Sequence, residues 1–390
     1  MRSVFITAGP VHGSLDPNKI VTNRSRGLWA MEFARYLLLQ NYGRDYVVHL
    51  LVPDTLEGVE RFTEVEFAPH LRQYPVIIRH KGFEDYREKC KMLARVCDAG
   101  ILAAAVVNWM PAGNYPLDHK MPTHGYEPGD LIQIPFRLMP RVIEDMKREN
   151  PNLTLIGCKL LAGAPHEDLI EAAYSGVLLP ARCNAVLAND LADLKRKVLV
   201  YPDLSTFAYE NDFRRLFDDL RLLIEDTHYR TDHVLTNWPV AKSGTLFDDI
   251  LDKYRDRFTQ RGGGQDRVFG SLYLPTGDIC LGICSPREKG SQFTAKDAVV
   301  VESLEGNTIR VVGPSKATLN APLLIRVAQK YRHATAILHL HEQLPDVPTV
   351  PYAPPGTVRD NDRDIPGSAF NIEGHGFVAC LGSNLEVIRW

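Results

Sequence analysis

Three histidines toward the end of the sequence have the type and spacing of metal ligands. His339 and His341 follow the apolar run 336–338, and in a strand both side chains would leave on the same face. His375 stands between two glycines, where the chain can turn sharply. Three imidazoles with one open position suit catalysis by a divalent ion, zinc above all. The alternative is a buried, hydrogen-bonded histidine pair with His375 as a loop residue.

The segments around these histidines support the metal site. A lysine-led turn and helix precede the strand (313–343), a proline-rich loop follows it (347–357), and a His-Gly pair comes later (374–382). In this order, over roughly residues 240 to 390, they resemble the class II aldolase and adducin family. The resemblance implies that the three histidines bind zinc or another divalent metal. It also implies that Ser285 and Thr318 lie near the place where relatives hold a substrate phosphate or carboxylate.

One residue of this region departs from the family pattern. The family usually has a glutamate in the turn before the helix, which acts as general acid/base, and Asn320 occupies that place here. An amide cannot take the proton. Two alternatives stay open. In the first, another carboxylate serves as the acid/base, and the candidates are Glu342, directly after His341, and Glu373, two residues before His375. In the second, the metal site is a binding or structural remnant.

The N-terminal half begins with a strand, a glycine-containing loop and a helix. Apolar residues predict the strand near 4–6, and apolar spacings of three and four predict the helix over 27–40. Such a unit is typical of nucleotide-binding domains. With the later pieces it resembles phosphopantothenoylcysteine synthetase, and the matching segments, in chain order, are 3–27, 101–111 (an apolar strand), 118–134, 139–143 and 184–190.

The second resemblance implies the activation of an acid by a nucleotide. In that family a carboxylate attacks the alpha phosphate of CTP, or of ATP in animal relatives, and an amine then displaces the nucleotide. Asn23 matches the asparagine that handles the acyl intermediate, and Lys120 matches the lysine that neutralises the phosphates. Without the resemblance, Asn23 is a turn or N-cap residue and Lys120 a solvated cation. The expected nucleotide-binding residues are Gly9, Ser25, Gly27, Ala105, Asn108, Pro140, Arg141, Val142, Ile143 and Asn189.

This region also departs from its family. The two lysines expected in the helix before 184–190 are missing, and only Arg182 is basic there. The usual aspartate of the second strand is replaced by Asn108. Because fewer cations face the triphosphate, we expect weaker nucleotide binding than in the synthetases.

Length and composition fit two fused α/β domains. With 390 residues the chain is longer than a domain built on a single hydrophobic core usually is. A charged amphipathic helix over 211–230 closes the first, Rossmann-like parallel-sheet domain (1–235). The second, truncated class II aldolase-like domain covers 240–390. A net charge of −3 without a basic face argues against nucleic acid, and no apolar run is long enough for a membrane. Seven cysteines without a C-x-x-C pair fit reduced thiols in the cytoplasm.

The sequence therefore predicts a biosynthetic enzyme. Its first activity is that of a phosphopantothenate–cysteine ligase-like acid–amine ligase, which uses CTP or ATP with magnesium and joins a small phosphorylated carboxylic acid to an amine. Its second is a metal-dependent lyase or aldolase step. Since both families commonly form oligomers, we expect a homo-oligomer. The alternative is a non-catalytic metal- and ligand-binding protein with both folds repurposed.

Overall fold

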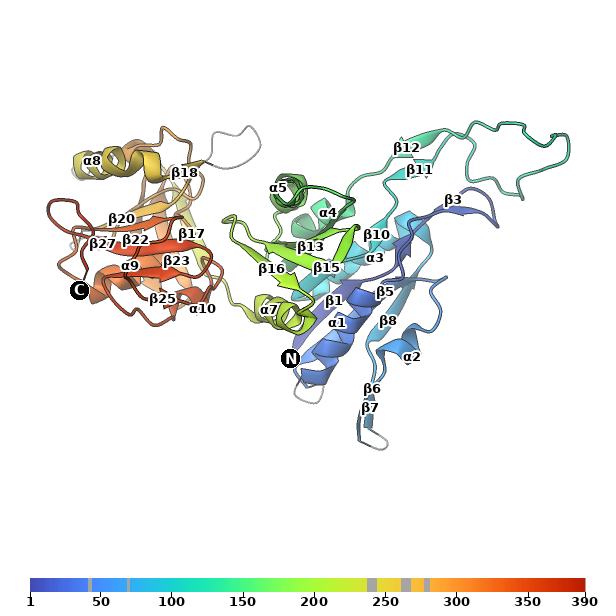
Figure 1. The fold of residues 1–390 in the computed structure, drawn as a ribbon, viewed down its shortest axis with the longest axis horizontal. Coiled ribbons are helices and arrows are strands. Elements are labelled where there is room, and N and C mark those ends of the chain that lie inside the picture. Colours follow the sequence, from blue (N-terminus) through green and yellow to red (C-terminus); the bar gives the residue numbers. More distant parts are fainter. Residues whose placement is uncertain (41–43, 69–70, 237–243, 261–267, 277–280, 390) are drawn as a thin grey trace. The chain divides into compact units, whose positions relative to one another are not determined.

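The computed structural model describes residues 1–40, 44–68, 71–236, 244–260, 268–276 and 281–389, and its contacts divide the chain into two compact units (Figure 1). The first unit comprises Met1–Pro202 and Ala208–Ile224, and the second comprises Asp203–Phe207 and Glu225–Trp390. The contacts thus place the division earlier than the expected 235–240, part of which lies outside the described residues. Segment 203–207 packs with the second unit.

The sheet of the first unit has the strand order β16-β15-β14-β13-β9-β1-β5-β8. The strands are β1 (Arg2–Thr7), β5 (Tyr46–Pro53), β8 (Val76–His80), β9 (Ala99–Leu102), β13 (Thr154–Leu161), β14 (Ala185–Asp190), β15 (Asp193–Val200) and β16 (Thr206–Glu210). All pairs from β14 to β8 are parallel, and β15 is antiparallel to β14. β1 lies in the middle, with later strands on both sides, as in dinucleotide-binding sheets. The predicted Rossmann-like parallel sheet is confirmed.

Helices pack on this sheet because its strands are apolar on both faces. They are α1 (Leu28–Leu39), α2 (Val59–Thr63), α3 (Gly82–Val96), α4 (Val142–Glu149), α5 (His166–Ala173), the π-helix η2 (Tyr174–Leu178), α6 (Leu179–Ala181) and α7 (Phe213–Glu225). Both helices predicted here exist, and α1 and α7 begin and end inside the predicted ranges 27–40 and 211–230.

Short strands accompany the large sheet. They form the pairs β2 (Pro10–Val11) with β10 (Ala105–Val106), β3 (Gly13–Ser14) with β4 (Ile20–Val21), β6 (Val65–Ala68) with β7 (Leu71–Gln73), and β11 (Trp109–Pro111) with β12 (Phe136–Leu138). The prediction of a single apolar strand over 101–111 is therefore wrong. It breaks after Leu102, because the amides of Ala104 and Ala105 bond to Thr7 Oγ1 (3.0 Å) and Gly9 O (2.9 Å) instead of continuing the ladder.

The second unit is a nine-stranded mixed sheet in the order β17-β23-β22-β21-β20-β24-β27-β26-β25. Its strands are β17 (Arg230–Leu235), β20 (Ser271–Pro275), β21 (Gly282–Cys284), β22 (Val299–Glu305), β23 (Thr308–Gly313), β24 (Ala336–Leu340), β25 (Thr349–Val350), β26 (Ala369–Ile372) and β27 (Gly376–Leu381). Its helices are α8 (Gly244–Tyr254), α9 (Ala321–Lys330), α10 (Val358–Asn361) and the 3₁₀ turns η3 (Arg255–Arg257) and η4 (Ala295–Asp297). β18 (Thr259–Gln260) and β19 (Val268–Phe269) form a separate pair.

The central strand β24 is buried on both faces, and its alternation decides where His339 points. Leu338 and Leu340 belong to one apolar cluster, which includes residues of α8. Ile337 belongs to the other cluster, which includes residues of α9. Because side chains alternate, His339 lies on the same face as Ile337. None of the described helices has the length and apolar character needed to cross a membrane.

Candidate functional site

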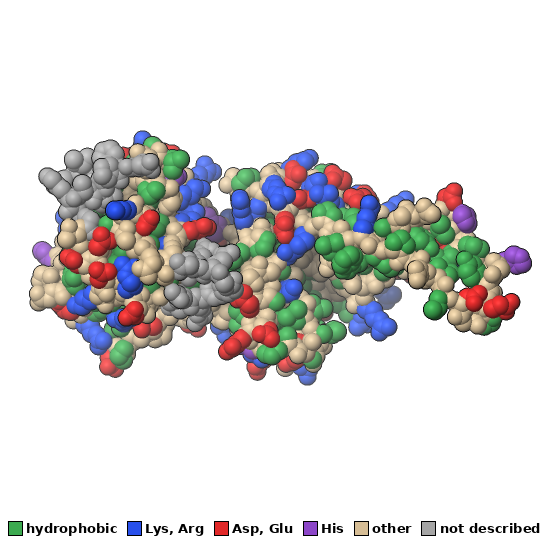
Figure 2. Space-filling model, turned by 90° about the horizontal axis from the view of Figure 1, so that it is seen from above, with side chains coloured by type: hydrophobic (Ala, Val, Ile, Leu, Met, Phe, Trp, Pro, Cys, Tyr) green, Lys and Arg blue, Asp and Glu red, His purple; other side chains and the backbone are tan. Residues whose placement is uncertain are grey.

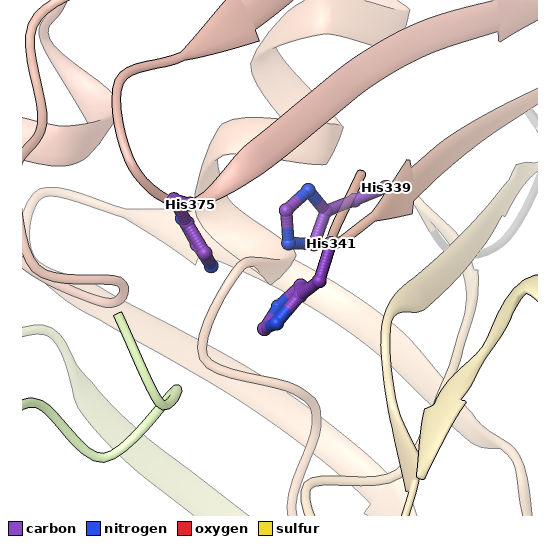
Figure 3. Close-up of side chains that lie close together, drawn as sticks. All are labelled: His339, His341 and His375. Atoms are coloured by element: carbon purple, nitrogen blue, oxygen red, sulfur yellow. The ribbon is translucent and has the colours of Figure 1, made fainter. Parts of the chain in front are cut away.

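The structure brings the three predicted histidines together in the second unit. His339 lies in β24, His341 directly follows that strand, and His375 directly precedes the neighbouring β27. Their ligand atoms all lie within 4.8 Å of one another. The ring centroids are 4.6 Å apart for His339 and His375 and 4.7 Å apart for His341 and His375. Figure 3 shows the three rings turned toward a common point.

A sharp turn between β26 and β27 puts His375 in this place. The amide of His375 donates to Ile372 O (3.1 Å), which closes the turn. Gly376 has φ 145°, and a Cβ there would lie 2.0 Å from Leu340 O. Only glycine fits this position, because the backbone of β24 passes too close for any side chain.

Burial favours the neutral form of His339 and His375. His339 Nδ1 lies 2.8 Å from Phe377 O, and since a carbonyl only accepts, Nδ1 carries the proton and Nε2 presents its lone pair. Burial lowers the pKa of His339 to about 4. Burial also lowers the pKa of His375 well below its ordinary value. Neutral imidazole is the form that binds a metal.

The unpaired ring nitrogens fit a metal ion. His339 Nε2 and both ring nitrogens of His375 are buried and make no hydrogen bond with the residues that the structure describes. Each buried, unpaired polar atom costs about 1 to 3 kcal/mol. An ion bound between the rings would satisfy the nitrogens that face it, so the donor set fits a divalent cation with nitrogen ligands.

A carboxylate that the sequence analysis missed lies beside the cluster. Asp203 Oδ2 is 3.2 Å from His375 Nε2 and accepts a hydrogen bond from Tyr352 Oη (3.0 Å). The amide of Ser205 donates to Asp203 Oδ1 (2.9 Å). Burial raises the pKa of Asp203, while the bonds from Ser205 and Tyr352 act in the opposite direction. No local pattern in the sequence points to this residue, because segment 203–207 reaches the site only through the folding of the chain.

Asn320 is buried at the start of α9 and belongs to a small polar cluster. Its Nδ2 donates to Ser271 Oγ (3.5 Å), which shares a 2.7 Å hydrogen bond with Thr318 Oγ1. Ser271 is the register partner of His339 in the pair β20–β24. Ser285 joins the cluster, since its carbonyl accepts from the Thr318 amide (3.0 Å). The amide at position 320 thus lies in the neighbourhood of the histidines but has no group that can remove a proton.

The two glutamates proposed as the acid/base group, Glu342 and Glu373, are exposed. Glu342 is exposed and pairs with Arg257 at 2.5 Å. Glu373 is exposed too, and its backbone amide bonds to Val350 O (3.0 Å). Within the described residues, neither carboxylate belongs to the histidine cluster. That one of them moves a proton at this site stays a prediction.

In the first unit, several predicted nucleotide-binding residues meet beyond the carboxyl ends of β1 and β9. Gly9 and Gly27 touch, since a Cβ on Gly27 would lie 2.5 Å from Gly9 N. Ala105 donates its amide to Gly9 O (2.9 Å), and Asn23 Nδ2 donates to Val106 O (2.9 Å). In parallel α/β sheets, ligands bind at this edge, where the strand order reverses.

The remaining predicted residues continue along the same edge. Asn108 accepts the Met139 amide (2.8 Å), which holds the segment containing Pro140 and Arg141 in place before α4 begins. Val142 is buried, and the Ile143 side chain packs over Gly157 in β13, where an added Cβ would lie 3.0 Å from Ile143 Cδ1. Asn189 lies at the end of β14.

A cation that is absent from the sequence-based list reaches this edge. Lys197 Nζ donates to Asn189 Oδ1 (2.7 Å), and burial lowers the pKa of this lysine. By contrast, Lys120 is exposed in the segment between β11 and β12, and no contact joins its side chain to the edge within the described residues. Ser25 donates its amide to Asn23 O (3.1 Å) in the loop before α1.

Comparisons with known proteins give only distant similarities. No family model matches the chain, and no curated protein matches it. Among solved structures, it is similar to the DNA/pantothenate metabolism flavoprotein from Streptococcus pneumoniae, with 19% identity, a TM-score of 0.44, and coverage of 57% of this chain and 99% of that one. A Cab2 mutant in complex with phosphopantothenate-cysteine is 14% identical, with a TM-score of 0.46 and coverage of 57% of this chain and 86% of that one.

A second kind of solved structure also matches. L-fuculose 1-phosphate aldolase is 17% identical, with a TM-score of 0.29 and coverage of 38% of this chain and 79% of that one. The similar solved structures thus include a protein in complex with phosphopantothenate-cysteine and an aldolase. The α/β fold class predicted from the sequence is confirmed by the two sheets.

Proposed function

We propose that the second unit is a metal-dependent lyase or aldolase-type catalyst. The observation that carries the proposal is the convergence of three histidines, two of which are buried and have ring nitrogens that make no hydrogen bond in the described structure. When bound, a divalent ion, zinc in the first instance, supplies Lewis-acid polarisation of a substrate oxygen. Phe377 O orients His339 for that ion. His341 is the least buried of the three, so we expect a substrate to approach beside it.

The acid/base group distinguishes catalysis from binding alone. Asn320 favours the second candidate, a non-catalytic metal- and ligand-binding protein, because an amide cannot replace the usual glutamate. Elemental analysis and mass spectrometry of the untreated protein test both candidates. We expect about one divalent ion per chain, and a phosphorylated, carbonyl-containing molecule retained with it would favour the lyase.

For the first unit we propose an acid–amine ligase of the phosphopantothenate–cysteine kind, with CTP or ATP and magnesium. The support is the meeting of Gly9, Gly27 and Ala105 at the carboxyl edge of a sheet with the dinucleotide-binding strand order. Asn23 would contact the activated acid there, and Lys120 the nucleotide phosphates. The substrates proposed are a small phosphorylated carboxylic acid and an amine.

Removal of the Lys120 charge tests the ligase proposal. If Lys120 contacts the triphosphate, Lys120→Ala will weaken nucleotide binding by about 1 to 3 kcal/mol, the range for one charge-assisted partner. Calorimetry with CTP, ATP, UTP and GTP measures this. Lys91→Ala, which removes a partly exposed lysine paired with Glu88 on α3, is the control and should bind as the wild type does. Absence of binding below millimolar nucleotide would rule out the ligase.

We also propose that the protein is a homo-oligomer in the cytoplasm. Large apolar side chains are exposed on β11, β12 and the segment between them, including Leu131 (93% exposed) and Leu138 (64%). Figure 2 shows apolar side chains gathered along this segment. A second copy of the chain would cover them. We expect Leu131→Asp to lower the mass measured by light scattering toward that of one chain, and a monomeric wild type would contradict this.

A further inference from the structure

The acidic residue beside the histidine cluster has an unusual set of partners. Asp203 contacts a serine amide, a tyrosine hydroxyl and His375, all at its two carboxylate oxygens. A second buried carboxylate of this unit, Asp360, is paired with Arg363. The contacts found for Asp203 among the described residues thus include no lysine or arginine. A buried carboxylate without a cationic partner is costly, and a metal ion would remove that cost.

The distance between Asp203 and His375 suits two groups around one ion. In Figure 3 the ring nitrogen of His375 far from its backbone, Nε2, points toward the other two rings. Asp203 Oδ2 lies 3.2 Å from this nitrogen, yet the pair does not form a hydrogen bond. Two ligands of a tetrahedral zinc ion, with bonds of about 2.0 to 2.1 Å, are about 3.3 Å apart. The group of ligand atoms that all lie within 4.8 Å of one another contains the three histidines and not Asp203. Asp203 therefore lies beside the three-histidine group.

Packing holds Asp203 in this position. The following residue, Leu204, is buried with φ 65°, a left-handed conformation that costs a side-chain-bearing residue about 1 to 2 kcal/mol. The Ser205 amide fixes Oδ1 and leaves Oδ2 toward the cluster. Phe207 packs on Tyr352, with ring centroids 5.0 Å apart, and lies against Gly374. Such local strain is kept where surrounding contacts determine the conformation, commonly at functional sites.

We propose that Asp203 is the acidic residue of the metal centre, whose carboxylate would lie beside the ion and help to hold it, with Tyr352 fixing the orientation of the carboxylate. The residue reaches the site from segment 203–207, far from the histidines in the sequence and outside the region that resembles the aldolases. Asp203 supplies a negative charge beside the histidine ligands, which the amide of Asn320 cannot supply. This proposal rests on the metal centre of the proposed function.

The test measures metal affinity in the full-length protein. Zinc binding is followed by competition with a chromophoric chelator, and Co²⁺ absorption spectra report on the surroundings of the ion. Asp203→Asn keeps the shape and the bond from Ser205 but removes the charge. We expect its zinc affinity to fall about 10- to 100-fold, as for partners next to metal ligands, and its Co²⁺ spectrum to shift. Asp203→Glu should restore part of the affinity, and Tyr352→Phe should lose less than Asp203→Asn.

A matched variant separates this effect from a general loss of structure. Asp226 is also buried in the second unit but is bonded to Arg359 at 2.8 and 2.9 Å. Asp226→Asn should bind zinc as the wild type does. If Asp203→Asn keeps wild-type affinity and an unchanged Co²⁺ spectrum, the assignment of Asp203 is overturned while the metal centre stands. If the wild type binds neither ion, the metal centre itself is overturned.

Discussion

His339→Ala will lose most of the bound metal, whereas the wild type will hold about one divalent ion per chain. The orientation of His339 is set by its own strand neighbour, since its Nδ1 is bonded to Phe377 O and its Nε2 faces the other rings. Removing one of three nitrogen ligands leaves two, too few to hold zinc tightly against water. Elemental analysis after purification without chelator, followed by addition of zinc, manganese or iron, measures the effect.

A histidine nearby in the sequence provides the control for this loss. His333 is exposed, in the turn that precedes β24, and is outside the cluster. His333→Ala should keep the full metal content. Circular dichroism of both variants excludes unfolding as the cause. A wild type with less than about a tenth of an ion per chain, and with no uptake of added metal, would contradict the three-histidine site.

The period-two pattern was sufficient to predict how His339 and His341 come together. The apolar run before them forms β24, a central strand buried on both faces, so alternation alone fixes their common side. The glycines around His375 likewise indicated the turn that the structure contains. These predictions depended on local rules, which act on neighbouring residues and can be read from a short segment.

The carboxylates of the site could not be found in this way. Glu342, one of the two acid/base candidates, pairs with Arg257 in η3, which follows α8. Asp203 is separated from His375 by most of the second unit's sequence, and only tertiary packing brings them to 3.2 Å. A contact of this kind has no periodicity and no turn signal, so one sequence does not predict it.

The same limit explains the broken strand at 101–111 and the position of Lys120. The apolar composition of 101–111 is compatible with one long strand, and hydrogen bonds to Thr7 and Gly9 end it after Leu102. These partners lie in β1 and the loop after it, so the end of β9 depends on a contact between distant segments. The family resemblance predicted Lys120 at the nucleotide, and in the structure Lys120 is exposed in the segment between β11 and β12.

Gly376→Ala will disrupt the junction of β24 and β27 and, with it, the position of His375. The added Cβ would lie 2.0 Å from Leu340 O and 2.8 Å from His341 Cα, both backbone atoms of the segment that carries two ligands. The backbone angle φ of 145° is strained for any residue other than glycine. We expect the second unit to lose about 3 to 5 kcal/mol of unfolding free energy, a loss typical of severe backbone clashes, and metal content to fall with it.

Gly306→Ala is the matched control, because it makes the same chemical change at a positive φ without a clash. Gly306 has φ 52° in the turn between β22 and β23, and nothing lies within 4 Å of the added Cβ. It should cost only about 1 kcal/mol and leave the metal bound. Hydrogen exchange of the β24 and β27 amides separates the two variants, since protection there reports on their pairing. Equal protection and equal metal content in both would show that β24 and β27 can separate to accept a side chain, and that the close approach at Gly376 does not position His375.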